Sequence, residues 1–227
     1  MNLLFLDTET TGKGTEDRLV QVAFKAPGDD CLVCNFKPPV PITFEAMATH
    51  HITEKMLADT QPFSDSHLKP LLQELLNENI MVAHNAIFDK EMLEREGLIV
   101  PRYIDTLKLA QFLFDEPSYK LQVLRYKYNL EVDGVAHSAD GDVAVLEKLF
   151  NHLCNKFAEK HTGNYIEALI EMQAISQAPT LLRRISFGKH RGTEFKALPR
   201  DYLKWLSGQS DLDEDLKFTL KHYLTLP

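Results

Sequence analysis

The chain has 227 residues and a formal net charge of −8 at pH 7, so it is long enough for one sizeable core and an appendage. A negative charge of this size argues against a protein built to coat nucleic acid. Apolar runs such as 3–6 and 143–146 are far too short to cross a bilayer. The N-terminus lacks the basic segment and long apolar stretch of a secretory signal, so a cytoplasmic location is the default expectation.

The chain has three cysteines, which cannot all form disulfides and which fit a reducing compartment. Cys31 and Cys34 form a C-x-x-C pair that could bind zinc or act in redox chemistry. The stretch around them is typical of a β-strand, in which residues three apart point to opposite faces. We therefore do not expect a structural zinc site.

The first predicted elements are strands at 3–6, 18–26 and 31–37, with the breaker cluster "PGDD" between the last two. Their short connections predict an antiparallel meander. Farther along, apolar spacing predicts helices over 64–79, 87–96 and 138–160, a strand at 80–84, and a strand passing into a helix within 103–114.

A meander followed by alternating strands and helices predicts an α/β domain with a mixed sheet over residues 1–165. The pattern then weakens, and 166–180 is interpreted as a connector to a small α+β module at 181–227. In that module we expect a hairpin around Gly188 and Gly192, followed by the helix "PRDYLKWL". Its Trp205 could stack on a base, but the pattern favours a role in the core of the module.

Charge is unevenly distributed along the chain. Residues 181–227 carry nine Lys and Arg against six Asp and Glu, so the module is basic while the rest is acidic. These cations could form an ordinary solvated face. The two glycines that flank Lys189 and Arg191 suggest a tight turn that presents cations, and we favour contact with phosphate there.

Two carboxylates stand one residue apart at the end of the first predicted strand. Asp7 and Glu9 would project from the same face of that strand. Like charges this close repel, so one carboxyl stays protonated unless a cation lies between them. A single D-x-E motif of this kind is usually only a solvated strand end.

Two more acidic segments occur where helices are predicted to begin. Asp89 falls on the first turn after the strand at 80–84, and Asp142 lies near the start of 138–160, with His137 just before it. If the first and fourth strands are neighbours, these carboxylates converge. Carboxylate oxygens are suitable ligands for Mg²⁺ or Mn²⁺. Two such ions roughly 3.5–4 Å apart would promote an in-line phosphoryl displacement. Asp7, at the centre of the group, would be the ligand that both ions share. His137 could take the proton from the attacking water.

The segments "FLDTETTG", "HNAIFD" and "HSADGD" resemble the three motifs of the DEDDh exonucleases, a branch of the ribonuclease H-like superfamily. The resemblance covers about residues 3–155. The segment "SFGKHRGTEFKALPRDYLKWL", with "LKFTLKHYL", resembles the C-terminal module of the exodeoxyribonuclease X group. Together these implied relationships predict a ribonuclease H-like mixed five-stranded sheet with flanking helices and a small C-terminal module.

The resemblance implies a metal-dependent 3′–5′ exodeoxyribonuclease that acts on DNA 3′ ends, single-stranded or duplex, and releases 5′-mononucleotides. It assigns catalytic roles to Asp7, Glu9 and His137, with His137 as general base, and it expects two Mg²⁺ ions, which Mn²⁺ can replace. The implied metal ligands are Asp7, Glu9, Asp89 and Asp142.

Substrate-side roles are implied for several further residues. One departure from the family occurs directly after "DTETTG", where the family commonly has a leucine that packs on the terminal bases and this chain has Lys13, which suits a phosphate better. Of the adjacent His50 and His51, at least one is expected to be structural rather than a metal ligand. The predicted substrate-binding residues are Thr10, Thr11, Lys13, Asn85, Phe88, Lys189 and Arg191.

Three alternatives remain open at this stage. The same chemistry could act on RNA, because the fold does not separate the two sugars. A catalytically silent nucleic-acid-binding protein has little support, because all four carboxylates and His137 are present. A homodimer is also open, since some members of the family dimerise.

Overall fold

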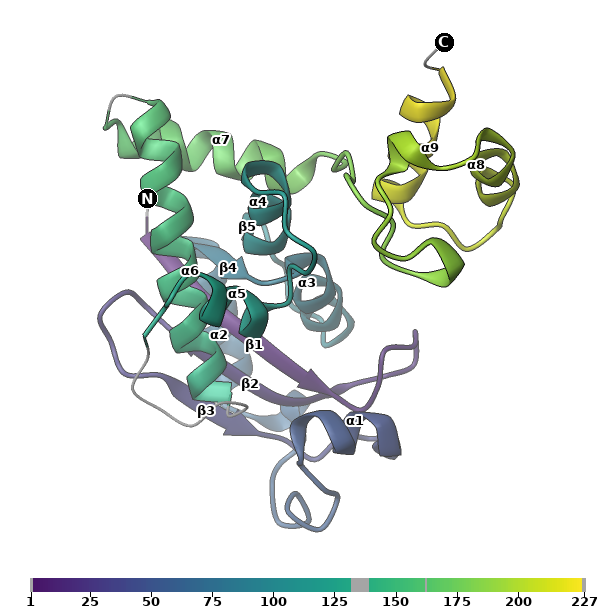
Figure 1. Cartoon of the computed structure of the whole chain (residues 1–227). Coiled ribbons are helices and arrows are strands. Elements are labelled where there is room, and N and C mark those ends of the chain that lie inside the picture. Colours follow the sequence, from purple (N-terminus) through teal and green to yellow (C-terminus); the bar gives the residue numbers. More distant parts are fainter. Residues whose placement is uncertain (1, 132–138, 162, 226–227) are drawn as a thin grey trace.

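The computed structural model describes residues 2–131, 139–161 and 163–225. In this part of the chain, five strands form one mixed sheet in the order β3-β2-β1-β4-β5 (Figure 1). Strand β1 is antiparallel to β2, β2 is antiparallel to β3, and β1, β4 and β5 are parallel. The predicted meander and mixed sheet are therefore confirmed. The strands are β1 Asn2–Thr10, β2 Leu19–Lys25, β3 Leu32–Asn35, β4 Asn79–Ala83 and β5 Tyr103–Asp105.

Alternation along β1 separates two apolar layers. Leu3 and Phe5 point into one layer, and Leu4 and Leu6 point into the other. The same alternation places Cys31 in the first layer and Cys34 in the second, which confirms that they lie on opposite faces. Since the two thiols are separated by the sheet, this pair does not form a joint zinc or redox site.

Each face of the sheet is covered by its own helices. Residues of α4 to α7 form the first layer, and residues of α2 and α3 form the second. A shorter helix, α1, lies with a small apolar cluster of its own beyond β2. The helices are α1 Phe44–His50, α2 Leu68–Glu78, α3 Ala86–Arg95, α4 Thr106–Leu113, α5 Leu121–Lys127, α6 Ala139–Lys160 and α7 Tyr165–Gln177.

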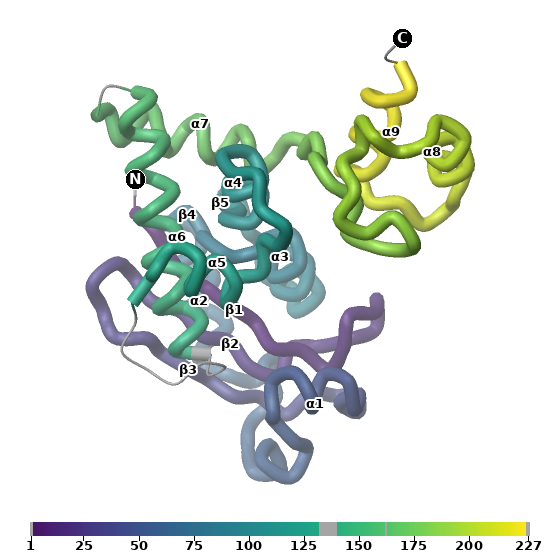
Figure 2. The backbone as a smooth tube through the Cα atoms, in the orientation of Figure 1, coloured from purple at the N-terminus to yellow at the C-terminus, as the bar shows by residue number. Residues whose placement is uncertain are grey.

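Residues 181–225, here called the C-terminal unit, have a separate apolar cluster. The tube in Figure 2 shows this unit beside the sheet and its helices, joined to them by the segment that follows α7. It contains α8 Arg200–Ser207, α9 Glu214–Thr225 and an isolated antiparallel bridge between Arg184 and Glu194. Pro199 precedes α8, as the helix pattern predicts.

The structure differs from the sequence-based expectation over 166–180. Most of this segment is α7, whose Ala168, Leu169 and Met172 are buried in the layer against α6 and the sheet. The prediction of a connector was therefore wrong for 166–177, because a helix with a buried apolar stripe belongs to the core that it covers. Only a few residues after Gln177 link the two units.

Trp205 also differs from its expected place. Its side chain is 58% exposed, while Leu203 and Leu206 of the same helix are buried. The core of the C-terminal unit is thus built by the leucines, and the prediction that Trp205 anchors it was wrong. Within the described residues, we find no helix that is both long enough and apolar enough to span a membrane.

Candidate active site

Asp7 and Glu9 lie where β1 extends past its parallel neighbour. Pairing with β4 ends at Phe5 opposite Val82, while pairing with β2 continues to Thr10. Both carboxylates lie on the face of the sheet that α6 covers, because they share the alternation of Phe5. The strand therefore presents two acidic side chains beyond the carboxyl end of β4.

Asp89 reaches this point from α3. Its side chain is only 3% exposed, and its Oδ1 accepts hydrogen bonds from the Thr8 backbone N–H at 3.0 Å and from Thr8 Oγ1 at 2.7 Å. Thr8 lies between Asp7 and Glu9 and points to the opposite face. The two hydrogen bonds therefore fix Asp89 against the same stretch of β1 that carries the other two carboxylates.

Asp142 lies in the first turn of α6, and its Oδ1 accepts a short hydrogen bond from Gln122 Nε2 of α5. Val143, the next residue, is buried in the layer against β1 and β2. This packing holds the start of α6 over the carboxylates of β1. His137, the predicted general base, lies outside the described residues.

Electrostatics show that the four carboxylates are near one another. The pKa of Asp7 is raised well above its ordinary value by burial, then by the charges of Asp89, Glu9 and Asp142. Burial, followed by the charge of Asp142, raises the pKa of Glu9 to about 7, although the Lys13 ammonium opposes this. Burial also raises the pKa of Asp89 to about 7, against the effect of its bonds to Thr8. Negative charge is therefore costly here.

The loop after β1 is ordered by its threonines. Thr10 Oγ1 donates to the Gly12 carbonyl at 2.6 Å, and Thr11 Oγ1 donates to Asp17 Oδ1 at 2.7 Å. Both threonines are buried, whereas Lys13 is exposed. The two predicted substrate-side hydroxyls thus shape the loop from within, and Lys13 is one of the side chains that this loop exposes to solvent.

His50 supports the same loop from α1. Its Nδ1 accepts the Ile52 backbone N–H at 3.0 Å, so Nε2 carries the proton and donates to the Thr10 carbonyl at 3.2 Å. Burial lowers the pKa of His50, which favours this neutral tautomer. The expectation that one of the two adjacent histidines is structural is confirmed for His50.

The predicted substrate-side residues Asn85 and Phe88 stand at the start of α3. Asn85 is exposed, has a left-handed backbone with φ of 72°, and donates its backbone N–H to Asp105 Oδ1 at 3.0 Å. In the described part of the chain its side chain makes no capping hydrogen bond. The residue is therefore fixed through its backbone, which leaves the amide side chain at the surface. Phe88 is half-buried.

His84, which directly follows β4, fixes the segment between α4 and α5. Its Nε2 donates to the Tyr119 carbonyl at 2.7 Å, and its Nδ1 lies 2.9 Å from Thr106 Oγ1. Burial lowers the pKa of His84 to about 4, so the ring is neutral at physiological pH. The ring thereby ties the chain before α5 to the end of β4.

A cavity of about 770 Å³ lies between this region and the C-terminal unit. Asn85 and Lys120 line it on one side, and Arg191 and Gly192 line it on the other. Lys189, in the same turn as Arg191, is exposed and its Nζ lies 5.6 Å from the centre of the Tyr202 ring. The two predicted phosphate-binding cations are thus carried by one exposed turn, and Arg191 lines the same cavity as Asn85.

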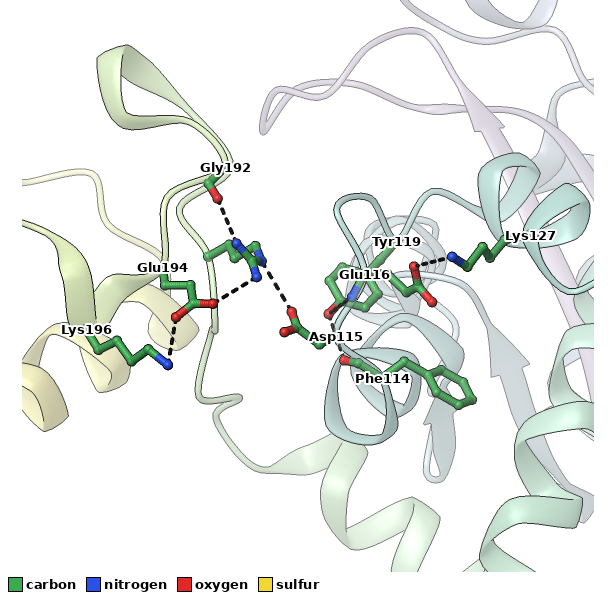
Figure 3. Close-up of polar contacts among 9 residues, drawn as sticks. Phe114, Asp115, Glu116, Tyr119, Lys127, Gly192, Glu194 and Lys196 are labelled. Atoms are coloured by element: carbon green, nitrogen blue, oxygen red, sulfur yellow. Dashed lines mark hydrogen bonds and ion pairs between the residues drawn. The ribbon is translucent and has the colours of Figure 1, made fainter.

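The two walls of the cavity are joined by Arg184. Its guanidinium contacts Asp115 Oδ1 at 3.3 Å, Glu194 Oε1 at 2.9 Å and the Gly192 carbonyl at 3.2 Å. Figure 3 shows Gly192 and Glu194 on the C-terminal unit and Asp115 opposite them. Lys108 adds a second link, because its Nζ lies 3.2 Å from Asp215 Oδ1 of α9. These ion pairs connect the C-terminal unit to α4 and to the segment that follows it.

Sequence reasoning missed the residues that hold the site together. Thr8 orients Asp89, Gln122 binds Asp142, and His84 and Asp105 fix the entry to α3. Thr8 stands inside the "DTE" motif, so its position between two carboxylates was a usable signal. The others act through contacts between distant parts of the chain, which leave no local pattern.

Comparisons with known proteins agree with this site. The model of the exonuclease family, RNase T type, matches residues 4–150. The chain is similar to exodeoxyribonuclease 10 of Escherichia coli K12, with 31% identity over 98% of both chains. It is also similar to the DNA polymerase III subunit epsilon of Treponema pallidum, with 28% identity over 79% of this chain and 85% of that protein.

A solved structure described as exonuclease X in complex with 5′ overhanging duplex DNA matches with a TM-score of 0.60 and 27% identity. That match covers 77% of this chain and 99% of the other. An Escherichia coli ExoI–ssDNA complex shows the same fold, with a TM-score of 0.58 and 18% identity. That match covers 75% of this chain and 43% of the other. With its three motifs in place, this chain belongs to the exonuclease family and, within it, to the DEDDh 3′–5′ exonucleases.

Proposed function

We propose that this chain is a Mg²⁺-dependent 3′–5′ exodeoxyribonuclease that releases 5′-mononucleotides from DNA. The observation that carries the proposal is the meeting of Asp7, Glu9, Asp89 and Asp142 at one end of the sheet, where burial and the neighbouring carboxylates raise the pKa values of Asp7 and Glu9. The choice of DNA is supported by the similarity to exodeoxyribonuclease 10 over 98% of both chains. The DNA-bound exonuclease X structure supports the same choice.

The acidic residues fit a pair of hard divalent cations. Carboxylate oxygens are the preferred ligands of Mg²⁺ and Mn²⁺, and charges that raise one another's pKa are stabilised by a cation between them. In the described residues, no group of three or more His, Cys, Asp or Glu side chains is placed to hold a metal ion. Thr8 and Gln122 hold one oxygen each of Asp89 and Asp142. We propose that a bound cation draws the carboxylates closer together than they lie here.

We propose that all four carboxylates bind the cations, with Asp7 shared between them. When bound, two such ions activate the attacking water and stabilise the leaving oxygen of the scissile phosphodiester. Asp7 and Glu9 are held by β1, and Asp89 is oriented by Thr8, so the chain supplies a nearly fixed set of ligands. His137, which the third motif places before α6, would accept the proton of the attacking water.

We further propose that the strand to be cut is held on both sides of this centre. Asn85 and Phe88 would contact nucleotides near the 3′ end, and exposed Lys13 would contact a phosphate. Thr10 and Thr11 would act by shaping the loop and offering its backbone. Lys189 and Arg191 would bind the phosphates of the strand farther from the cut.

The experiment is a digestion of a DNA strand labelled at its 3′ end, with Mg²⁺, with EDTA, and with His137→Ala. The wild type with metal should release labelled mononucleotide at once, and EDTA should abolish the release. His137→Ala should slow cleavage by about 10²–10⁴-fold, the usual effect of losing a general acid–base group. Matched RNA should be cut more slowly. Equal rates with and without metal, or near-normal turnover of the variant, would refute the assigned roles.

A further inference from the structure

Helix α8 presents an aromatic face to solvent. Leu203 and Leu206 are buried, so the helix is anchored by one side. Tyr202 is half-buried at the edge of this core, and Trp205, three residues later, lies beside it on the solvent side with ring centres 5.5 Å apart. Trp205 is 58% exposed and is the only tryptophan of the chain. A large aromatic ring in this position adds little to the core of its own unit, which leaves it available for a ligand.

The turn at Gly188–His190 extends this face. The His190 ring centre lies 4.5 Å from that of Tyr202, and Lys189 Nζ lies 5.6 Å from the same ring. Gly188 has φ of +65°, a backbone conformation that favours glycine, and it lies next to Tyr202 Oη. We call His190, Tyr202 and Trp205 the aromatic ladder.

The same turn connects the ladder with the carboxylate site. Arg191 and Gly192, directly after His190, line the cavity that Asn85 borders on the opposite wall. Asn85 precedes Asp89 by four residues, which is about 6 Å along a helix at 1.5 Å per residue. A strand whose 3′ end lies at the carboxylates could therefore pass Asn85 and Arg191 before it reaches the ladder.

We propose that the aromatic ladder is a stacking platform for unpaired bases of single-stranded DNA, several nucleotides upstream of the 3′ end that is cut. This inference rests on the proposed function, because it supplies the direction in which the strand leaves the active site. Trp205 stacks on a base, Tyr202 supports its ring from behind, and Lys189 neutralises a neighbouring phosphate. Aromatic rings beside cations are the usual elements of sequence-independent single-strand binding.

The chemistry of this surface favours a single strand over other occupants. Bases in a duplex stack on one another, so only unpaired bases expose a face to Trp205. Lys189 and Lys204 are exposed beside the ladder, and residues 181–227 carry nine basic against six acidic residues. A polyanion is therefore attracted here, although the whole chain is negatively charged.

The test uses Trp205 itself as the probe. The full-length protein is titrated in EDTA, which prevents cleavage, with oligothymidylates of about twelve and about four nucleotides. The longer oligonucleotide should quench the tryptophan fluorescence in a saturable manner. The shorter one should bind without reaching the ring and should leave the emission unchanged.

Variants then test whether the contact contributes to affinity. Because Trp205→Ala and Trp205→Phe have no tryptophan, the affinities of all variants are measured by fluorescence anisotropy of dye-labelled oligonucleotides in EDTA. Trp205→Ala should weaken binding of the longer oligonucleotide about tenfold and so reduce the ratio of long to short affinities, while Trp205→Phe should retain most of that ratio. Lys189→Gln should make the dependence of log K on log salt shallower by about 0.7, the loss of one single-strand phosphate contact. Phe218→Ala is the matched control, since Phe218 is 43% exposed in the same unit but outside the ladder, and it should keep the wild-type ratio.

The outcomes separate this inference from the proposed function. If the wild type cuts DNA with Mg²⁺ but Trp205 emission does not respond, or if Trp205→Ala keeps the wild-type ratio, the platform is wrong and the exonuclease assignment stands. Equal losses in Trp205→Ala and Phe218→Ala would likewise overturn it. If the wild type with Mg²⁺ cuts no DNA, the proposed function itself has failed.

Discussion

The carboxyl groups of Glu9 and Asp89 both have pKa values of about 7, because burial disfavours their charged forms. Unfolded carboxyl groups titrate near their ordinary values of 4.5 and 3.8. At these two groups the folded protein therefore binds more protons than the unfolded chain between about pH 4 and pH 7. Without metal, their contribution to stability falls as pH rises through this window, and above it their whole cost is present.

Divalent metal should remove this cost, which gives a prediction about melting temperature. We expect Mg²⁺ to raise the Tm more at about pH 8 than at about pH 5.5, because at the lower pH protons already neutralise these carboxyl groups. Thermal melts with excess Mg²⁺ and with EDTA at both pH values measure the effect. A gain from Mg²⁺ that is as large at the lower pH would contradict the assignment of these groups as ligands.

The second residue-scale prediction concerns Asp7, whose pKa is raised by burial and by three neighbouring carboxylates. Asp7→Asn removes a charge that is costly in the metal-free protein, so the Tm in EDTA at about pH 8 should rise by about 2 °C or more. The same variant should lose at least about 10²-fold in cleavage rate, since the shared metal ligand is gone. A destabilised variant would show that the site is held together by Asp7 itself.

At the scale of elements, α7 shows why a segment with weak sequence periodicity can still be core. Met172 is fully buried against the layer formed with α6 and the sheet, and Ser176 Oγ accepts the Asp105 backbone N–H at 2.8 Å. Asp105 in turn accepts the Asn85 backbone N–H at the start of α3. The helix therefore supports the entry to the candidate site from behind.

This role of α7 predicts different costs for two substitutions in the same helix. Met172→Ala should lower the free energy of unfolding by about 2–5 kcal/mol, as expected for a large side chain lost from a packed core. Ile170→Ala is the control, because Ile170 is 52% exposed and should change stability by less than about 0.5 kcal/mol. Urea denaturation of both variants gives the comparison. Similar small effects would mean that α7 is only a connector.

At the scale of the whole molecule, the chain consists of a sheet unit with two apolar layers and a C-terminal unit with its own cluster. Ion pairs join the two units: the Arg184–Asp115 pair is largely exposed, and the Lys108–Asp215 pair is mostly buried. An exposed pair such as Arg184–Asp115 contributes little energy.

This division predicts how removal of residues 181–227 would act. The shortened chain keeps both apolar layers and all four carboxylates, so it should fold and retain kcat within about twofold at saturating DNA. Its KM for DNA should rise by about tenfold or more, because phosphate and stacking contacts are lost. Steady-state kinetics with the full and shortened chains test this. An unchanged KM with a reduced kcat would place the unit in the chemistry instead.

The sequence alone determined where the acidic side chains stand in the fold, because strand alternation and helix starts are local. The spacing of Asp7 and Glu9 was enough to place both on one face, and Asp89 and Asp142 follow predictable element boundaries. Tertiary structure alone decided what surrounds them. The hydrogen bond between Thr8 and Asp89 joins residues that are 81 positions apart. Helix α7 belongs to the core because it packs on α6. Trp205 is exposed because Leu203 and Leu206 occupy the core side of the same helix. Burial depends on which surfaces meet, and no local pattern records that.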